Sequence, residues 1–112
     1  MASKLEFVQY AAGQLRDAGT ITYRKMFGEY GLYCDGKIFA LVCENQLFVK
    51  ITEAGRRAAP DLKMAPPYDG AKPYFLVEDI DDREFLTDFV AATCEGLPPP
   101  RPKKVRKENR GI

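Results

Sequence analysis

The sequence predicts one α+β domain of two layers, a mainly antiparallel sheet and a set of covering helices. Three observations carry this prediction. The chain has 112 residues, enough for one hydrophobic core but too few for two. Tight-turn signals at Asp35-Gly36 and Glu44-Asn45 separate short runs of β-branched and aromatic residues. Helical periodicity flanks those runs, so we expect the order helix, four strands, short helix, strand, helix.

The first helix is predicted over residues 4–18. Ser3-Lys4-Leu5-Glu6 has the S-x-x-E form of a capping box, in which the serine hydroxyl and the glutamate carboxylate accept hydrogen bonds from free amides at a helix start. Gly19 suits the end of this helix. The apolar stripe that we expect to face the core consists of Leu5, Val8, Ala12 and Leu15.

Four strands are expected next. Residues 20–27 are rich in β-branched and aromatic side chains, and residues 28–31 contain two glycines that suit a turn. Asp35-Gly36 is the strongest turn signal, because glycine accepts the positive φ of a type I′ turn. The three strands that follow the first are predicted near residues 30–34, 37–43 and 46–51.

The tight turns also predict which side chains share a face of the sheet. The expected cross-strand pairs are Tyr33 with Ile38, Leu32 with Phe39, Val42 with Leu47 and Leu41 with Phe48. One face then carries Tyr33, Ile38, Ala40, Val42, Leu47, Val49 and Ile51. The other face carries Tyr30, Leu32, Phe39, Leu41, Cys43 and Phe48. Neither face is polar.

The second half of the chain alternates between helix and strand signals. Thr52 can cap a short helix that ends before Pro60, and residues 60–73 read as an irregular connection rich in proline. Residues 74–77 form a further strand. The last helix is expected to open with Asp81 as its cap and Glu84 three positions on, and to end at Gly96. Its buried stripe is predicted to be Phe85, Leu86, Phe89, Val90 and Thr93.

Charge divides the chain into a domain at residues 1–96 and a basic tail at residues 97–112. The first part holds 11 basic and 15 acidic side chains, a balance of −4, whereas the tail holds six basic and one acidic, a balance of +5. The tail, LPPPRPKKVRKENRGI, is led by prolines, which predicts an extended, disordered segment without a core. No apolar run is long enough to span a bilayer and no secretory signal opens the chain, so a cytoplasmic location without membrane contact is expected.

The residue types that carry most catalytic chemistry are missing. The chain has no histidine, which removes Ser-His-Asp and Cys-His arrangements and the usual general base near neutral pH. The glycines of residues 28–36 lack the spacing of a phosphate-binding loop. Cys34, Cys43 and Cys94 lack CxxC spacing, which favours reduced, packed thiols over a disulfide or a zinc site, with Cys94 the most exposed. The acidic residues from Glu78 to Glu84 suit a helix start. We therefore expect no enzyme activity, no cofactor and no metal.

Residues 24–50, RKMFGEYGLYCDGKIFALVCENQLFVK, carry a family resemblance. The RKMFG run, the YGLY that follows, the DGK turn and the FAL and LFVK strands resemble the N-terminal domain of the TfoX/Sxy family, bacterial regulators associated with natural competence. Agreement at Lys72-Pro73-Tyr74 and in the last helix extends the resemblance over about residues 3–95. It implies a two-layer fold of the secretion-chaperone type, a role in transcription regulation and no catalytic residue. Larger members add a C-terminal helical domain, in whose place this chain has its tail.

Two binding hypotheses follow from these patterns. In the first, helices cover one sheet face, and the second apolar face binds a protein partner or a second copy of the chain. The residues expected at that surface are Tyr30, Leu32, Phe39, Leu41 and Phe48. The alternative is that sheet curvature and the connection at residues 60–73 cover this face.

The second hypothesis is weak nucleic-acid binding by the tail, with affinity that falls as salt rises. The residues expected to contact phosphates are Arg101, Lys103, Lys104, Arg106, Lys107 and Arg110. The alternative is that a short basic tail only aids solubility.

Overall fold

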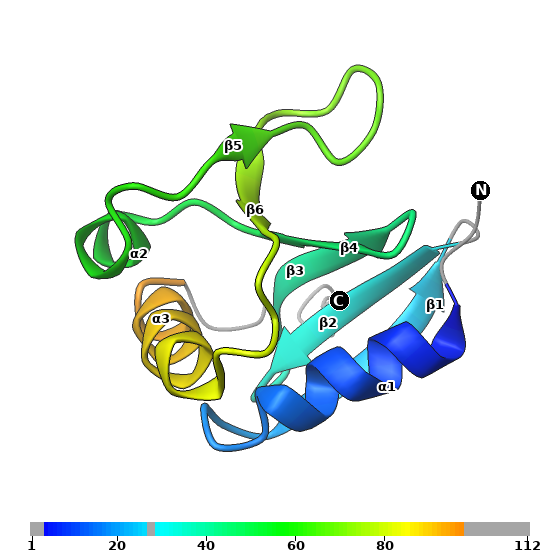
Figure 1. The fold of residues 1–112 in the computed structure, drawn as a ribbon, viewed down its shortest axis with the longest axis horizontal. Helices are drawn as coiled ribbons and strands as arrows, with labels where there is room; N and C mark the ends of the chain where they lie inside the picture. The colour runs from blue at the N-terminus through cyan, green and yellow to red at the C-terminus, as the bar shows by residue number, and fades with distance from the viewer. Residues whose placement is uncertain (1–3, 27–28, 98–112) are drawn as a thin grey trace, which may run out of the picture.

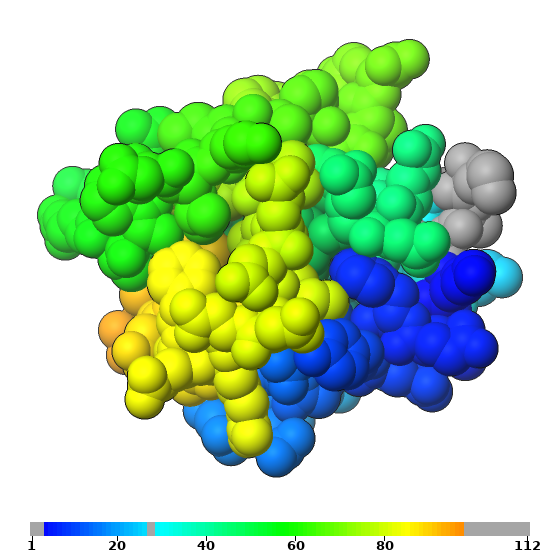
Figure 2. Space-filling model, in the orientation of Figure 1, coloured from blue at the N-terminus to red at the C-terminus, as the bar shows by residue number. Residues whose placement is uncertain are grey.

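A computed structural model describes residues 4–26 and 29–97, and these contain three helices and six strands. The strands form one antiparallel sheet in the order β1-β2-β3-β4-β6-β5. The helices lie together on one side of the sheet (Figure 1), and Figure 2 shows this helical layer, with α1 in blue, α2 in green and α3 in yellow to orange. The predicted α+β class and element order are confirmed, with one strand more than expected.

Helix α1 spans Leu5–Gln14, so it is shorter at its C-terminal end than the sequence predicted. Its N-cap is Lys4, whose backbone amide donates a 2.8 Å hydrogen bond to Asn45 Oδ1, while Ser3 lies outside the described residues. Val8, Ala11 and Leu15 face the core. The prediction for Leu5 is wrong, because this side chain at the first turn is 43% exposed.

The predicted hairpins are confirmed. Strand β1 (Ile21–Met26) pairs with β2 (Glu29–Cys34), and β3 (Lys37–Cys43) and β4 (Gln46–Val49) follow. All four residues of the two tight turns have positive φ, at 52° and 86° for Asp35-Gly36 and at 52° and 58° for Glu44-Asn45. The turn expected over residues 28–31 is wrong in extent, because β2 already begins at Glu29.

A β-bulge in the β2–β3 pair changes which side chains face the core. Tyr33 pairs with Ile38 as predicted, but Leu32 pairs with Ala40, which leaves Phe39 as an extra residue in β3. Leu32 and Phe39 are consequently fully buried in the core. Their predicted place on the second face is wrong, because one inserted residue reverses the alternation of side chains beyond it. The same holds for Tyr30, which pairs with the core residue Val42.

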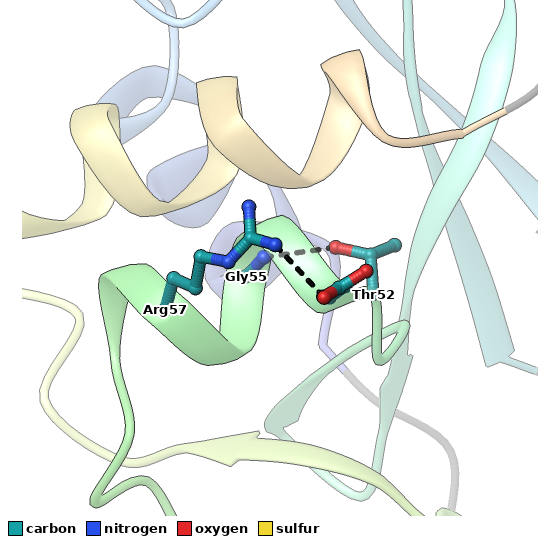
Figure 3. A network of polar contacts seen from close by, with 4 residues as sticks. Thr52, Gly55 and Arg57 are labelled. Carbon is teal, nitrogen blue, oxygen red and sulfur yellow. Dashed lines mark hydrogen bonds and ion pairs between the residues drawn. The ribbon is translucent and has the colours of Figure 1, made fainter.

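Helix α2 (Glu53–Ala58) is capped as predicted, because Thr52 Oγ1 accepts a 3.0 Å hydrogen bond from the Gly55 amide (Figure 3). An exposed ion pair of 2.8 Å joins Arg57 to Glu53 one turn apart. Gly55 is buried against α3, and a Cβ there would lie 2.9 Å from Thr93 Oγ1. The two helices are therefore in close contact at this glycine.

The connection at residues 60–73 contains a strand that the sequence analysis missed. Strand β5 (Met64–Ala65) pairs with the predicted strand β6 (Tyr74–Val77) at the edge of the sheet. A backbone hydrogen bond of 2.9 Å from the Leu76 amide to the Lys63 carbonyl extends this pairing. A two-residue strand followed by two prolines has too short a pattern to be recognised from the sequence.

Helix α3 (Arg83–Glu95) lies across the sheet beside α2. The prediction that Asp81 caps it is wrong by one residue, because Asp82 Oδ1 accepts a 3.2 Å hydrogen bond from the Phe85 amide. The predicted stripe of α3 and its end at Gly96 are confirmed. The Phe89 ring is fully buried, stacks on Phe85 and meets the edge of Phe75, both at centroid distances of 5.5 Å.

One hydrophobic core joins the helices to the inner face of the sheet. The buried strand residues of this core are Leu32, Cys34, Phe39, Ala40, Val42, Leu47, Val49, Phe75 and Val77.

Within residues 4–26 and 29–97, no helix combines the length and the apolar character needed to cross a membrane. The tail predicted for residues 97–112 lies, from residue 98 onward, outside the described residues, so its extended form stays a prediction.

Candidate binding groove

The opposite, outer face of the sheet carries a hollow of about 830 Å³. Strands β2, β3 and β4 contribute its first side, and the connection between β5 and β6 contributes the second. The residues from the strands and their turns are Met26, Glu29, Tyr30, Leu41, Cys43, Glu44, Gln46 and Phe48, and those from the connection are Pro66, Pro67, Tyr68 and Asp69. We call this hollow the groove.

Strand alternation places the apolar side of the groove. On β3, Leu41 and Cys43 alternate with Val42, which belongs to the core, so they point to the outer face. Leu41 pairs with Phe48 on β4, as predicted, and both line the groove. Phe48 in turn pairs with Leu76 on β6. A row of apolar side chains therefore crosses three neighbouring strands.

Gly31 shapes this side of the groove from β2. It pairs with Leu41, and a Cβ at this position would lie 2.7 Å from Met26 Cε and 3.2 Å from Ile38 Cδ1. The absent side chain thus leaves room for the Met26 thioether above the strand. A glycine inside a strand is a sequence signal for such a close approach. From the sequence, Gly31 was predicted only as part of a turn.

The second side of the groove comes from the connection of residues 66–69. Pairing of β5 with β6 holds the chain at the sheet edge, and Pro67 is buried while Tyr68 remains 62% exposed. A hydrogen bond of 3.1 Å from the Ala71 amide to the Tyr68 carbonyl and a positive φ of 85° at Gly70 turn the chain back. The alternative in which residues 60–73 cover the outer face is therefore correct in part, and the groove is the space that remains.

Two of the five predicted surface residues, Leu41 and Phe48, have their side chains at the groove. Tyr30 borders the groove, but it pairs with the core residue Val42 and packs against the core, so its side chain lies on the inner face. Leu32 and Phe39 do not reach the groove, because the bulge places them in the core with no exposed surface. Cys43 was predicted for this face but not as a site residue. Met26, Pro66, Pro67 and Tyr68 were not predicted, because they reach the groove only through tertiary structure.

Carboxylates dominate the charge of the groove. Glu29, Glu44 and Asp69 line it, and no lysine or arginine does so among the residues that the structure describes. Glu29 Oε2 accepts a 3.1 Å hydrogen bond from the Glu44 amide, which joins the start of β2 to the β3–β4 turn. The described side chains that line the groove thus include three acidic and no basic groups, which favours cationic ligands.

The Cys43 thiol is kept protonated. Burial raises its pKa to about 11, and the nearby carboxylates of Glu29 and Glu44 add to this shift. The pKa of Tyr74 is raised as well, first by burial and then by Tyr68 and Cys43. Because the thiolate is the nucleophilic form of cysteine, the groove presents Cys43 as an apolar contact near neutral pH. The arrangement is suited to binding.

The other cysteines lie in the core. Cys34, Cys43 and Cys94 are all free and buried, so the expectation that Cys94 is exposed is wrong; only 5% of it reaches solvent. Burial raises the pKa of Cys94, and a hydrogen bond with Cys34 raises it further. Lys37 Nζ donates a 2.7 Å hydrogen bond to the Cys94 carbonyl at the end of α3. These contacts tie α3 to the β2–β3 hairpin.

The acidic residues before α3 accept hydrogen bonds that belong to the fold. Asp82 caps the helix, Asp79 Oδ1 accepts a 3.1 Å hydrogen bond from the Asp81 amide, and Asp81 accepts one from the Tyr10 hydroxyl. Across the described ranges 4–26 and 29–97, no group of three or more Cys, Asp or Glu side chains is placed to hold a metal ion.

The residues of the nucleic-acid hypothesis, Arg101 to Arg110, all lie outside the described residues. That hypothesis therefore stays a prediction.

The fold is that of an α+β domain with one sheet face closed by helices and the other left partly open. The chain matches the family described as the TfoX N-terminal domain over residues 13–97, and it belongs to that family. This confirms the resemblance read from residues 24–50.

One curated relative extends the match to nearly the whole chain. It is a protein of Spirochaeta aurantia described as an uncharacterized 12.7 kDa protein in the trpE 5′ region. The two sequences are 30% identical over 112 residues, which cover 99% of this chain and 97% of that protein.

Proposed function

We propose that this TfoX N-terminal domain is a non-enzymatic, cytoplasmic protein-interaction module and that the groove is its binding surface. We also propose that the domain serves transcription regulation of the kind associated with competence. The observation that carries the proposal is the apolar row of Leu41, Phe48 and Leu76 across β3, β4 and β6, which helices leave uncovered and which carboxylates border.

The composition of the groove supports a protein ligand. Tyrosine, phenylalanine and methionine are enriched at the centres of protein interfaces, and Tyr68, Phe48 and Met26 line the groove. Tyr68, at the groove, is among the few large apolar side chains exposed in the described part of the chain, at 62%.

Site-specific photo-crosslinking tests the proposal. A benzophenone amino acid replaces Tyr68 at the groove in one variant and Tyr10, 48% exposed on α1, in a control variant. We expect Tyr68 to give an adduct with another protein in cells and Tyr10 to give none. Leu41→Glu, checked for folding by circular dichroism, should abolish the adduct.

Equal adducts from both positions, or none from Tyr68, would contradict the proposal. An adduct of the purified protein with itself would identify the partner as a second copy of the chain.

A further inference from the structure

We infer that the groove is occupied by the chain's own basic segment, residues 103–110, which competes with any other ligand. This inference rests on the proposed function, since it assigns a regulator to the same surface. The occupant would contact the apolar row of Leu41 and Phe48 and the carboxylates beside it. Charge, side-chain pattern and reach each support this occupant.

Charge complementarity is the first argument. The groove is lined by the carboxylates of Glu29, Glu44 and Asp69, and the domain at residues 1–96 has a balance of −4. Residues 103–110, KKVRKENR, hold five basic side chains and one acidic. Opposite potentials steer such a segment to this surface and set its orientation there.

The side-chain pattern of the segment is the second argument. Val105 stands between Lys104 and Arg106, so in an extended chain its side chain points away from those of its two neighbours. Val105 can therefore contact Leu41 and Phe48 while the flanking cations remain at the carboxylates. A purely polar basic segment would leave the apolar row in water.

Reach is the third argument. Leu97 lies beside the first residue of β3, because its carbonyl accepts a 3.5 Å hydrogen bond from Lys37 Nζ. Leu41 is four residues farther along the strand, about 13 Å away at the rise of a β-strand, and faces the opposite side of the sheet. The path from Leu97 therefore combines this length with a passage around the strand end to the other face. At about 3.1 Å per residue for a proline-rich extended chain, residues 98–105 span about 25 Å, which is enough to bring Val105 to Leu41.

Attachment makes even weak docking effective. A short linker holds the segment at a local concentration of about 1 mM. If the segment as a separate peptide binds with a Kd near 0.1 mM, the tethered segment occupies the groove with an occupied-to-empty ratio of about ten. An added ligand would then bind the full chain about tenfold more weakly than the chain that ends at residue 97. The chain shortened at residue 97 keeps every core residue of the described ranges 4–26 and 29–97.

The experiment measures binding of a fluorescent peptide of residues 98–112 by anisotropy at low salt. We expect it to bind the chain shortened at residue 97 and to bind the full chain about tenfold more weakly. In the shortened chain, Asp69→Lys should weaken peptide binding about tenfold, whereas Asp61→Lys, a matched exposed carboxylate outside the groove, should leave it unchanged.

Equal affinities for the full and shortened chains, or equal effects of the two substitutions, would overturn the inference. So would dimers of the full chain in light scattering that disappear on shortening, because the segment would then sit in a second copy. A Tyr68 adduct without peptide binding removes this inference and leaves the proposed function standing. Peptide binding without any adduct removes the proposed function alone.

Discussion

The two faces of the sheet are built from the same kinds of residue but are covered in different ways. On the inner face, Val42, Leu47 and Val49 are fully buried under helices. On the outer face, Leu41 and Phe48 meet an irregular connection with Pro66 and Pro67. A helix presents apolar side chains at a regular spacing that fills space densely, whereas a short proline-rich segment does not. The outer face therefore keeps a groove, and it is the face at which we propose that binding occurs.

Removal of a large side chain from each face gives the largest expected contrast. Phe89→Ala should lower the free energy of unfolding by about 3–5 kcal/mol, because it deletes a fully buried ring that stacks on Phe85 and makes an edge-to-face contact with Phe75. Leu41→Ala on the outer face should cost about 1 kcal/mol, since that side chain is partly exposed. Urea unfolding followed by circular dichroism measures both, and equal losses would mean that the outer face is packed as tightly as the inner one.

The contact between α2 and α3 gives the next contrast. Gly55→Ala should cost about 2–3 kcal/mol, because the new Cβ would lie 2.9 Å from Thr93 Oγ1 and 3.1 Å from the capping oxygen of Thr52. Gly13→Ala in α1 is the matched control. Its Cβ meets no atom within 4 Å, so alanine should stabilise the helix by about 0.5–1 kcal/mol. Thermal and urea unfolding of both variants would show whether the helical layer is tight only where α2 meets α3.

The turn between β2 and β3 supports both faces at once. Gly36→Val should cost about 1–2 kcal/mol, because a β-branched residue resists the φ of 86° at this position. Gly36→Asn should cost less, since asparagine tolerates positive φ. An unchanged melting temperature for Gly36→Val, with loss of the Tyr68 adduct, would show that the glycine contacts a ligand.

The smallest expected effect concerns the Cys43 thiol in the groove. With a pKa of about 11 against an ordinary 9.0, its thiolate fraction at pH 8 is about 100-fold lower than usual, so iodoacetamide should label it slowly. Because the folded pKa lies above the unfolded one, the thiol's stabilising contribution is complete below pH 9 and is lost as the pH rises through 11. Labelling at pH 8, detected by mass spectrometry with the unfolded chain as control, checks the raised pKa. Fast labelling of the folded chain would mean an open, activated thiol.

The strand pairing on one side of the groove could be predicted from local sequence pattern. The register that pairs Leu41 with Phe48 depends on the Glu44-Asn45 turn, whose two positive φ values are a local property of two residues. The same reasoning failed for Leu32 and Phe39, because a bulge has no signature in hydrophobic alternation. Met26 and Tyr68 were not predicted at the groove for another reason: their positions there depend on how the segments that carry them are held against the rest of the sheet.

The sequence by itself determined the α+β class, the element order, the two tight turns, the Thr52 cap and the family. These depend on capping, turn chemistry and periodicity, which act over a few residues. Tertiary structure alone decided that Phe39 faces the core, that β5 exists and that residues 66–69 stand over the outer face to form the groove. The physical reason is that each of these depends on pairing and packing between segments far apart in the chain, where small differences in burial outweigh local preference.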